Sequence, residues 1–437
     1  MNKDLVIIII GRVLQIIIML VSVRLLTTFL TPQEIGNYYI ILAFLAFFNL
    51  VLLNPPGMYF SRHLLQWQKS KNLLNALIIF IGWMIVTAII AIPISIAIYY
   101  WLGYETKFDL DLFLIYIVLA ILISTLHRNV TGGCNTLGFR KEFVIYLIIT
   151  LILGLAFSVT LVLYYLHSAF GWLFGPVLAE LLMLYMVFRF FVQKSALSLE
   201  KIRVTLTKER MKKVLVFAVP IGATTFLMWG QNTAYRFIVD YKYSAEVLGY
   251  IAVGLGVSTA VFGALENIAM QYFSPIFLKK ILDADRQQRA DAWNGIAKQI
   301  VPIYIFTAVF TVVMAEVLIN ILVDKKFHDS YIYTMYGVGI EFFRVMTNLL
   351  TNVSQAEHRT TRTIKPYILG FLISVGVLSM VDFGADYYYI PMVLGCAYVA
   401  VFLSMFVSMK RLLPIRIQVN LLKVALLSLP FFAMLSI

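Results

Sequence analysis

The sequence is poor in charge and in cysteine. Charged residues make up only 13% of the 437 residues, whereas apolar residues make up 61%; a soluble protein has roughly 25% charged residues. Cys134 and Cys396 are far apart in the sequence, so we expect neither a disulfide nor a metal site built from them. This composition excludes an ordinary soluble domain and predicts a chain that lies in a membrane.

Motifs for phosphate hydrolysis and zinc chemistry are also missing. No glycine-rich loop is followed by Lys-Ser or Lys-Thr, and no His-Glu-x-x-His pair occurs among the five scattered histidines. We therefore expect no ATP hydrolysis through that loop, no metal, no catalytic residues and no resident cofactor.

Apolar segments follow one another along the whole chain. About 20 apolar residues are needed to cross a bilayer, and twelve such segments are predicted, approximately at 5–29, 36–59, 73–101, 111–132, 143–166, 171–193, 213–239, 247–275, 299–323, 331–354, 366–382 and 388–409. A thirteenth stretch, 419–437, either spans the membrane, lies on its surface or begins a further segment. The predicted fold class is an all-α polytopic membrane protein.

Basic residues are concentrated at one end of these segments. With the N-terminus placed in the cytoplasm, 24 of the 35 Lys and Arg residues fall in cytoplasmic ends and loops, and four fall in outer loops. The positive-inside rule therefore predicts a cytoplasmic N-terminus. It also explains the net charge of +13 without nucleic acid as a partner.

Two stretches of the chain repeat each other at an offset of 212 residues. The matched residues are Arg24, Glu34 and Tyr38 in the first copy and Arg236, Glu246 and Tyr250 in the second. An offset near half the chain predicts two parallel six-helix bundles, 1–200 and 201–409, around a central cavity, with a C-terminal hydrophobic segment at 410–437. Two repeated bundles in a membrane are typical of transporters.

Polar residues recur on single faces of three predicted spans. They are Arg12 and Gln15 in the first span, Asn232, Arg236 and Asp240 in the seventh, and Glu341, Arg344 and Asn348 in the tenth. In the seventh span the face continues from Gly222 to Asp240 at steps of three and four, as on one helix. These side chains either line a cationic, substrate-binding cavity or hold helices together. Three arginines deep in the membrane favour the cavity.

Further cavity candidates lie near the ends of spans. Arg24 either lines the cavity or extends to the membrane interface. Asn54 precedes a diproline, which predicts either a kink or break or a plain helix end. Arg62 and Arg128 follow at the cytoplasmic ends of the second and fourth spans.

Four carboxylates are candidates for coupling to a proton or a sodium ion: Glu180, Asp240, Glu266 and Glu341. Buried carboxylates can bind protons reversibly. The alternative role for each is to pair with a buried arginine.

The motif after the first span carries a family resemblance. Pro32-Gln33-Glu34-Ile35-Gly36-Asn37-Tyr38 has the pattern Pro-x-Glu-x-Gly-x-Tyr, and Gly57 is followed by Arg62. These features resemble oligosaccharide (O-antigen) flippases of the Wzx type, the polysaccharide transporter branch of the multidrug, oligosaccharidyl-lipid and polysaccharide exporter superfamily. The second copy is looser, because Leu248 stands in the place of the glycine.

This resemblance implies a function and partners. The family moves undecaprenyl-diphosphate-linked repeat units across the bacterial inner membrane by alternating access, for O-antigen, lipopolysaccharide, capsule or exopolysaccharide assembly. The implied partners are a polyprenyl-diphosphate-linked glycan, membrane lipids, a polysaccharide polymerase and a chain-length regulator. Forked arginine donors suit such a diphosphate.

Three other classes stay open on the sequence. An ion-coupled exporter of drugs or other lipids shares the layout, although its cavity should favour acidic residues. A membrane-bound polysaccharide polymerase or ligase should carry a large outer loop, and the outer loops here are short. A scaffold subunit would not explain the charges within the membrane.

Overall fold

The fold is all-α, as predicted. The computed structural model describes residues 3–195, 208–282, 284–357, 359–417 and 423–424. Within these residues the regular structure consists of helices, without strands. Eleven helical segments among the described residues are long and apolar enough to cross a membrane, so the protein is a multi-pass membrane protein. The chain divides into two compact units, Met1–Trp229 (unit 1) and Gly230–Ile437 (unit 2).

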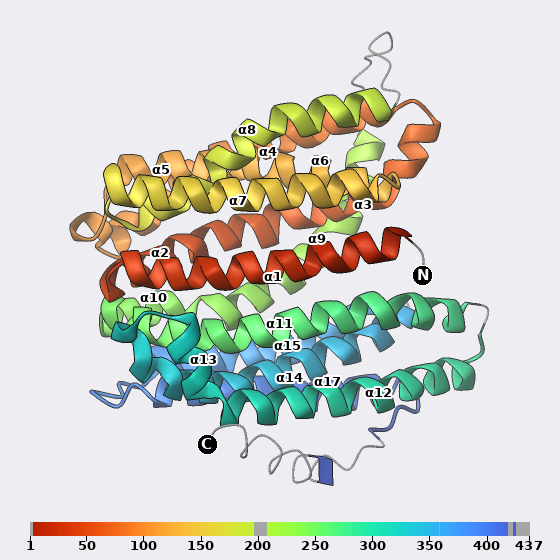
Figure 1. The fold of residues 1–437 in the computed structure, drawn as a ribbon. Helices are drawn as coiled ribbons and strands as arrows, with labels where there is room; N and C mark the ends of the chain where they lie inside the picture. The colour runs from red at the N-terminus through yellow and green to blue at the C-terminus, as the bar shows by residue number, and fades with distance from the viewer. Residues whose placement is uncertain (1–2, 196–207, 283, 358, 418–422, 425–437) are drawn as a thin grey trace. The chain divides into compact units, whose positions relative to one another are not determined.

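Unit 1 contains six candidate spans and most of a seventh. Its helices are α1 (Lys3–Phe29), α2 (Pro32–Phe47), the π-helical η1 (Phe48–Leu53), α3 (Asn54–Lys69), α4 (Leu73–Trp101), the short 3-10 helix η2 (Tyr104–Thr106), α5 (Leu110–Leu119), the π-helical η3 (Ala120–Ser124), α6 (Thr125–Thr136), α7 (Arg140–Tyr164), α8 (Ala169–Lys194) and α9 (Lys208–Thr233). Helix α7 packs along α8 on one side and α1 on the other (Figure 1).

The Pro-x-Glu-x-Gly-x-Tyr motif begins α2. The Thr31 hydroxyl accepts the backbone N–H of Glu34 at 3.2 Å, and Pro32 occupies the first helical position, where no N–H is needed. The Glu34 carboxylate also accepts the Asn37 side-chain amide at 3.1 Å and the backbone N–H of Ala169, the first residue of α8, at 2.6 Å. Glu34 therefore ties the start of α2 to the start of α8.

The diproline at 55–56 neither ends nor breaks the second span. It lies in the first turn of α3, directly after η1. Proline lacks an N–H, so carbonyls in the preceding turn lose their helical partners. Two carbonyls of η1 are bonded by side chains instead: the Trp83 indole donates to Leu52 and the Thr225 hydroxyl donates to Leu50, both at 2.9 Å. The π-helical turn thus lies within one continuous span of 38 residues.

Unit 2 contains the end of α9 and the helices that follow. These are α10 (Tyr235–Lys242), α11 (Ala245–Ile281), α12 (Arg286–Val313), α13 (Ala315–Leu322), the 3-10 helix η5 (Lys325–Ser330), α14 (Tyr331–Ala356), the 3-10 helix η6 (Thr360–Thr363), α15 (Ile364–Phe371), the π-helical η7 (Leu372–Gly376), α16 (Val377–Met380) and α17 (Tyr389–Lys410). Helix α14 packs against α11, α12 and α17 and is the central helix of this unit.

Small residues bring α14 close to α11. A Cβ atom on Gly337 of α14 would overlap the Ser258 hydroxyl of α11, and one on Gly254 of α11 would lie 2.5 Å from the backbone oxygen of Ser330. The Thr334 hydroxyl donates to the Gly254 carbonyl at 2.9 Å. Close helix contacts of this kind are typical of membrane bundles. They place the polar face of α14 next to α11.

Two predicted spans differ in detail from the expectation. The expected face from Gly222 to Asp240 runs over two helices, because α9 ends at Thr233 and α10 begins at Tyr235. Ala234 between them keeps right-handed helical angles, with φ −64° and ψ −24°, and both helices belong to one candidate span, Met211–Lys242. The expected tenth span is α14, a 26-residue helix about 39 Å long at 1.5 Å per residue. It is not one of the eleven apolar helices, because its polar face lowers its hydropathy.

Two predictions fall mainly outside the described residues. The boundary between the predicted bundles at 200/201 lies in 196–207, and nearly all of the C-terminal stretch 419–437 lies beyond residue 417. The division found in the structure falls at Trp229/Gly230, near the end of α9.

Candidate functional site

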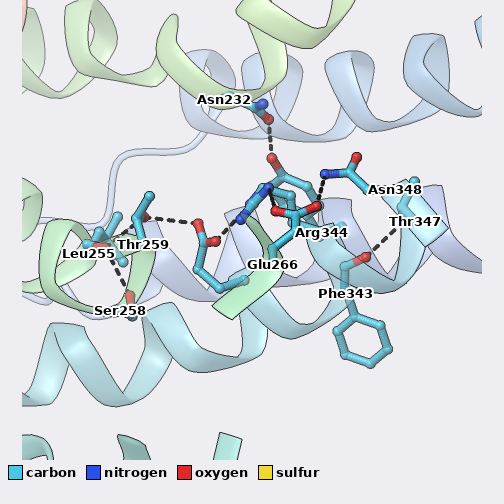
Figure 2. Close-up of polar contacts among 11 residues, drawn as sticks. Asn232, Leu255, Ser258, Thr259, Glu266, Phe343, Arg344, Thr347 and Asn348 are labelled. Carbon is cyan, nitrogen blue, oxygen red and sulfur yellow. Dashed lines mark hydrogen bonds and ion pairs between the residues drawn. The ribbon is translucent and has the colours of Figure 1, made fainter. Parts of the chain in front are cut away.

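A polar cluster lies between α11 and α14. Arg344 donates from Nε to Glu341 Oε2 at 2.7 Å and from Nη1 to Glu266 Oε2 at 2.9 Å. Asn348 Nδ2 donates to Glu266 Oε1 at 2.8 Å, and the Thr259 hydroxyl donates to Glu341 Oε1 at 2.9 Å. All four carboxylate oxygens therefore have a donor. These five residues form the Arg344 cluster, with Thr259 and Asn348 at its two ends (Figure 2).

Helical periodicity builds this cluster. Glu341, Arg344 and Asn348 follow at steps of three and four along α14, so their side chains share a face. Thr259 and Glu266 are seven residues apart on α11, which is two turns and again one face. The sequence predicted the α14 face and named Glu266. It missed Thr259, although its spacing from Glu266 was a usable signal.

The charges of the Arg344 cluster do not balance. One guanidinium faces two carboxylates, so the cluster has an excess of one negative charge when both are ionised. The Arg344, Glu266 and Glu341 side chains are 21%, 16% and 7% exposed. Charges this far from water persist when each is paired and hydrogen-bonded. Arg344 is therefore not a solitary cation, and Glu266 has the arginine-pairing role that was its alternative.

Asn232 and Tyr398 adjoin the cluster in unit 2. The Tyr398 hydroxyl of α17 donates to the side-chain oxygen of Asn232 at the end of α9 (Figure 2). Tyr398 is buried and lies within electrostatic reach of Glu341 and Arg344. Tyr398 is a second residue that sequence reasoning missed, since nothing in α17 marks it among many aromatic residues.

Arg236 and Asp240 lie together on the short helix α10. The Arg236 guanidinium carbon is 5.9 Å from the centre of the Tyr235 ring, within cation–π range. Asp240 is buried, at 3% exposed. They lie on the same candidate span as Asn232, Met211–Lys242.

In unit 1 two candidates have polar partners of their own. Arg12 of α1 is half-buried and donates from Nη1 to Gln15 Oε1 at 2.7 Å. The Glu180 carboxylate of α8 accepts a hydrogen bond from the Ser124 hydroxyl, in the last residue of η3. Ser124 was also missed from the sequence. In unit 1 the Arg12–Gln15 pair and the Glu180 carboxylate thus have different hydrogen-bond partners and do not form one cluster like that around Arg344.

The remaining candidates of unit 1 are dispersed. Arg24 is half-buried near the end of α1, whereas Asn54 in α3, Arg62 in α3 and Arg128 in α6 are exposed. The structure does not bring these four into one cluster with described contacts. A substrate-binding role for them stays a prediction.

Metal chemistry has no ligand set in the part of the chain that the structure describes. No group of three or more His, Cys, Asp or Glu side chains there is arranged to hold a metal ion. The two cysteines are free, Cys134 buried and Cys396 exposed.

Eleven apolar helices in the described part of the chain, with charged side chains buried between helices of one unit, define a multi-pass membrane protein. The chain belongs to the family described as polysaccharide biosynthesis protein, which matches residues 25–332. No curated protein sequence matches it.

Solved structures share the fold. The lipid II flippase MurJ in an inward closed conformation has a TM-score of 0.73 at 14% identity, over 99% of this chain and 92% of that one. An inward-facing multidrug resistance MATE transporter of the MOP superfamily has a TM-score of 0.64 at 10% identity, over 94% and 98%. The eukaryotic MATE transporter AtDTX14 has a TM-score of 0.57 at 12% identity, over 98% of this chain and 95% of that one. These structures show the fold of this chain, and the match to the polysaccharide biosynthesis family confirms the predicted family resemblance.

Proposed function

We propose that this protein flips polyprenyl-diphosphate-linked oligosaccharide repeat units across a bacterial inner membrane, for O-antigen, lipopolysaccharide, capsule or exopolysaccharide assembly. The observation that carries the proposal is the match of the polysaccharide biosynthesis family over residues 25–332. The fold similarity to MurJ, a lipid II flippase, supports the same class of lipid-linked substrate.

The charged groups within the spans fit such a substrate. A diphosphate is anionic, and a guanidinium binds phosphate oxygens through its forked donors. In unit 2, Arg344 and Asn348 present N–H donors side by side. In unit 1, the Arg12 guanidinium is a further donor. Alternating access would expose these donors to each leaflet in turn, with the lipid tail left in the bilayer.

We further propose a cytoplasmic N-terminus and coupling to a proton or sodium ion through the intramembrane carboxylates. Orientation can be tested with single cysteines in a cysteine-free background, at Lys71 between α3 and α4 and at Lys107 between η2 and α5. An impermeant maleimide should label Lys107→Cys in intact cells and Lys71→Cys only after the membrane is opened. The reverse pattern would invert the topology. A polymerase and a chain-length regulator are the proposed partners.

The direct test of function is a leaflet assay. In a strain lacking the gene, lipid-linked oligosaccharide should accumulate on the cytoplasmic leaflet, and the intact gene should restore its export. In proteoliposomes, the purified protein should move a labelled polyprenyl-diphosphate oligosaccharide to the side where an added enzyme can cleave it. Normal export in the deletion strain, or no movement in the vesicles, would contradict the proposal.

An ion-coupled exporter of cationic drugs is the second candidate. The observation in its favour is the excess of carboxylate over arginine in the Arg344 cluster, together with the MATE fold. The same vesicles can decide between the two, since an ion gradient should then drive transport of a cationic dye in place of the glycolipid.

A further inference from the structure

The two carboxylates that bind Arg344 are not equivalent. Arg344 donates to Glu341 from Nε and to Glu266 from Nη1. An anion that takes either of these donors must replace the carboxylate that now accepts from it. Burial, helix of origin and hydrogen-bond partners together identify which carboxylate gives way.

Glu341 is the fixed partner. It lies one turn from Arg344 on the same helix, its side chain is 7% exposed, and the contact to Arg344 Nε is 2.7 Å. Its other oxygen is held by Thr259 from α11. Displacing Glu341 would leave a buried carboxylate with fewer donors, which is costly.

Glu266 is the exchangeable partner. It comes from α11, not from α14, and its side chain is 16% exposed. The next two residues of α11 are exposed, and a Cβ on Gly263, one turn earlier, would meet open space. Both donors to Glu266, Arg344 Nη1 and Asn348 Nδ2, are terminal groups on one face of α14. Glu266 can therefore move away without disturbing the Glu341–Arg344 contact.

We propose that the Arg344–Asn348 donor pair is a binding site for a phosphate group and that Glu266 is its internal competitor. A guanidinium N–H and an amide N–H that converge on two oxygens of one anion bind a carboxylate here and suit a phosphate equally. This inference rests on the proposed function, in which the substrate carries a diphosphate. Glu266 holds the site until the diphosphate replaces it.

Uncharged tyrosines from other helices lie near the Arg344 cluster. Three such side chains lie within electrostatic reach of it: Tyr304 of α12, Tyr367 of α15 and Tyr398 of α17. Within the cluster itself, the incoming anion is opposed by Glu266 and Glu341. Removing the Glu266 charge should free the donors and lower the repulsion at once.

The test is binding of inorganic pyrophosphate to the purified full-length protein, measured by calorimetry. An apparent Kd exceeds the intrinsic Kd by the reciprocal of the competent fraction. If Glu266 occupies the donors in about nine molecules of ten, Glu266→Gln should tighten binding roughly tenfold. Glu266→Ala should do the same, since it removes the competitor altogether. The gain should disappear when either change is combined with Arg344→Ala.

Glu316→Gln is the matched control. Glu316 is an exposed carboxylate at the start of α13 in the same unit, so its removal changes the net charge equally but leaves Arg344 untouched. Unchanged or weaker binding in both folded Glu266 variants would overturn the inference, as would an equal gain in Glu316→Gln. Tighter pyrophosphate binding without glycolipid movement in vesicles would uphold the site and reject the proposed substrate.

Discussion

Replacing Arg344 by alanine should destabilise unit 2 and stop export. The change leaves Glu266 and Glu341 facing each other without the guanidinium that contacts both, at 2.9 and 2.7 Å. Breaking a buried ion pair by removing one partner costs about 3–5 kcal/mol. The side chains are 7–21% exposed, so partial hydration reduces this to about 3 kcal/mol. For a unit of this size the melting temperature should fall by roughly 6–12 °C.

A double-mutant cycle separates the pair from the rest of the cluster. Glu266→Gln alone should cost about 1 kcal/mol, since it removes the surplus charge as well as a hydrogen bond. The double variant Glu266→Gln/Arg344→Ala should lose about 1–2 kcal/mol less free energy of unfolding than the sum of the two single variants. Strict additivity, or a melting shift below about 2 °C for Arg344→Ala, would refute the reading of the cluster as a coupled ion network.

Thermal unfolding followed by fluorescence-detected size exclusion in detergent is suitable, with the membrane fraction quantified in parallel. Export should be expressed per folded molecule, because an unfolded variant also exports nothing. We expect Arg344→Ala and Arg236→Ala both to insert in the membrane and to lose most export. Full export in both would remove the arginines from the substrate route.

Three further predictions concern packing and capping in unit 1. Glu34→Gln should lower the free energy of unfolding by about 1–2 kcal/mol, because a charge-assisted bond to the first amide of α8 becomes a neutral one. The control Glu246→Gln, at an exposed position, should leave the free energy of unfolding almost unchanged. Gly175→Ala should lower the melting temperature by several degrees, since a Cβ there would overlap the backbone of α7. The control Gly82→Ala has open space and should be neutral or stabilising. Trp229→Phe should cost about 1 kcal/mol by losing the 3.0 Å bond to a carbonyl of α2; an unchanged melting curve would contradict that bond.

Features that depend on local spacing could be predicted from the sequence. The face of α14 with Glu341, Arg344 and Asn348 follows from the helical repeat, and the membrane class follows from composition. The second partner of Arg344 could not be predicted, because Glu266 is 78 residues away along the chain. Only the packing of α11 against α14 brings the two together.

The repeated motif shows the same limit in another form. Glu34 and Glu246 match in sequence, yet Glu34 is the third residue of α2 and Glu246 the second of α11. Proline occupies the first position of α2, whereas Ser244 caps α11. The one-residue shift turns the carboxylate by about 100° around the helix. Glu34 is consequently bonded to α8, while Glu246 is exposed.

The bonded carbonyls of η1 have a consequence for motion. Prolines inside a helix usually cause a kink. Here Trp83 and Thr225 anchor Leu52 and Leu50 from two other helices. Bending the span at this point would strip both carbonyls of their donors in an oily environment, at a cost of several kcal/mol. We therefore expect the second span to stay rigid at η1 and to move together with α4 and α9. Any bending during transport should occur at another place in the chain.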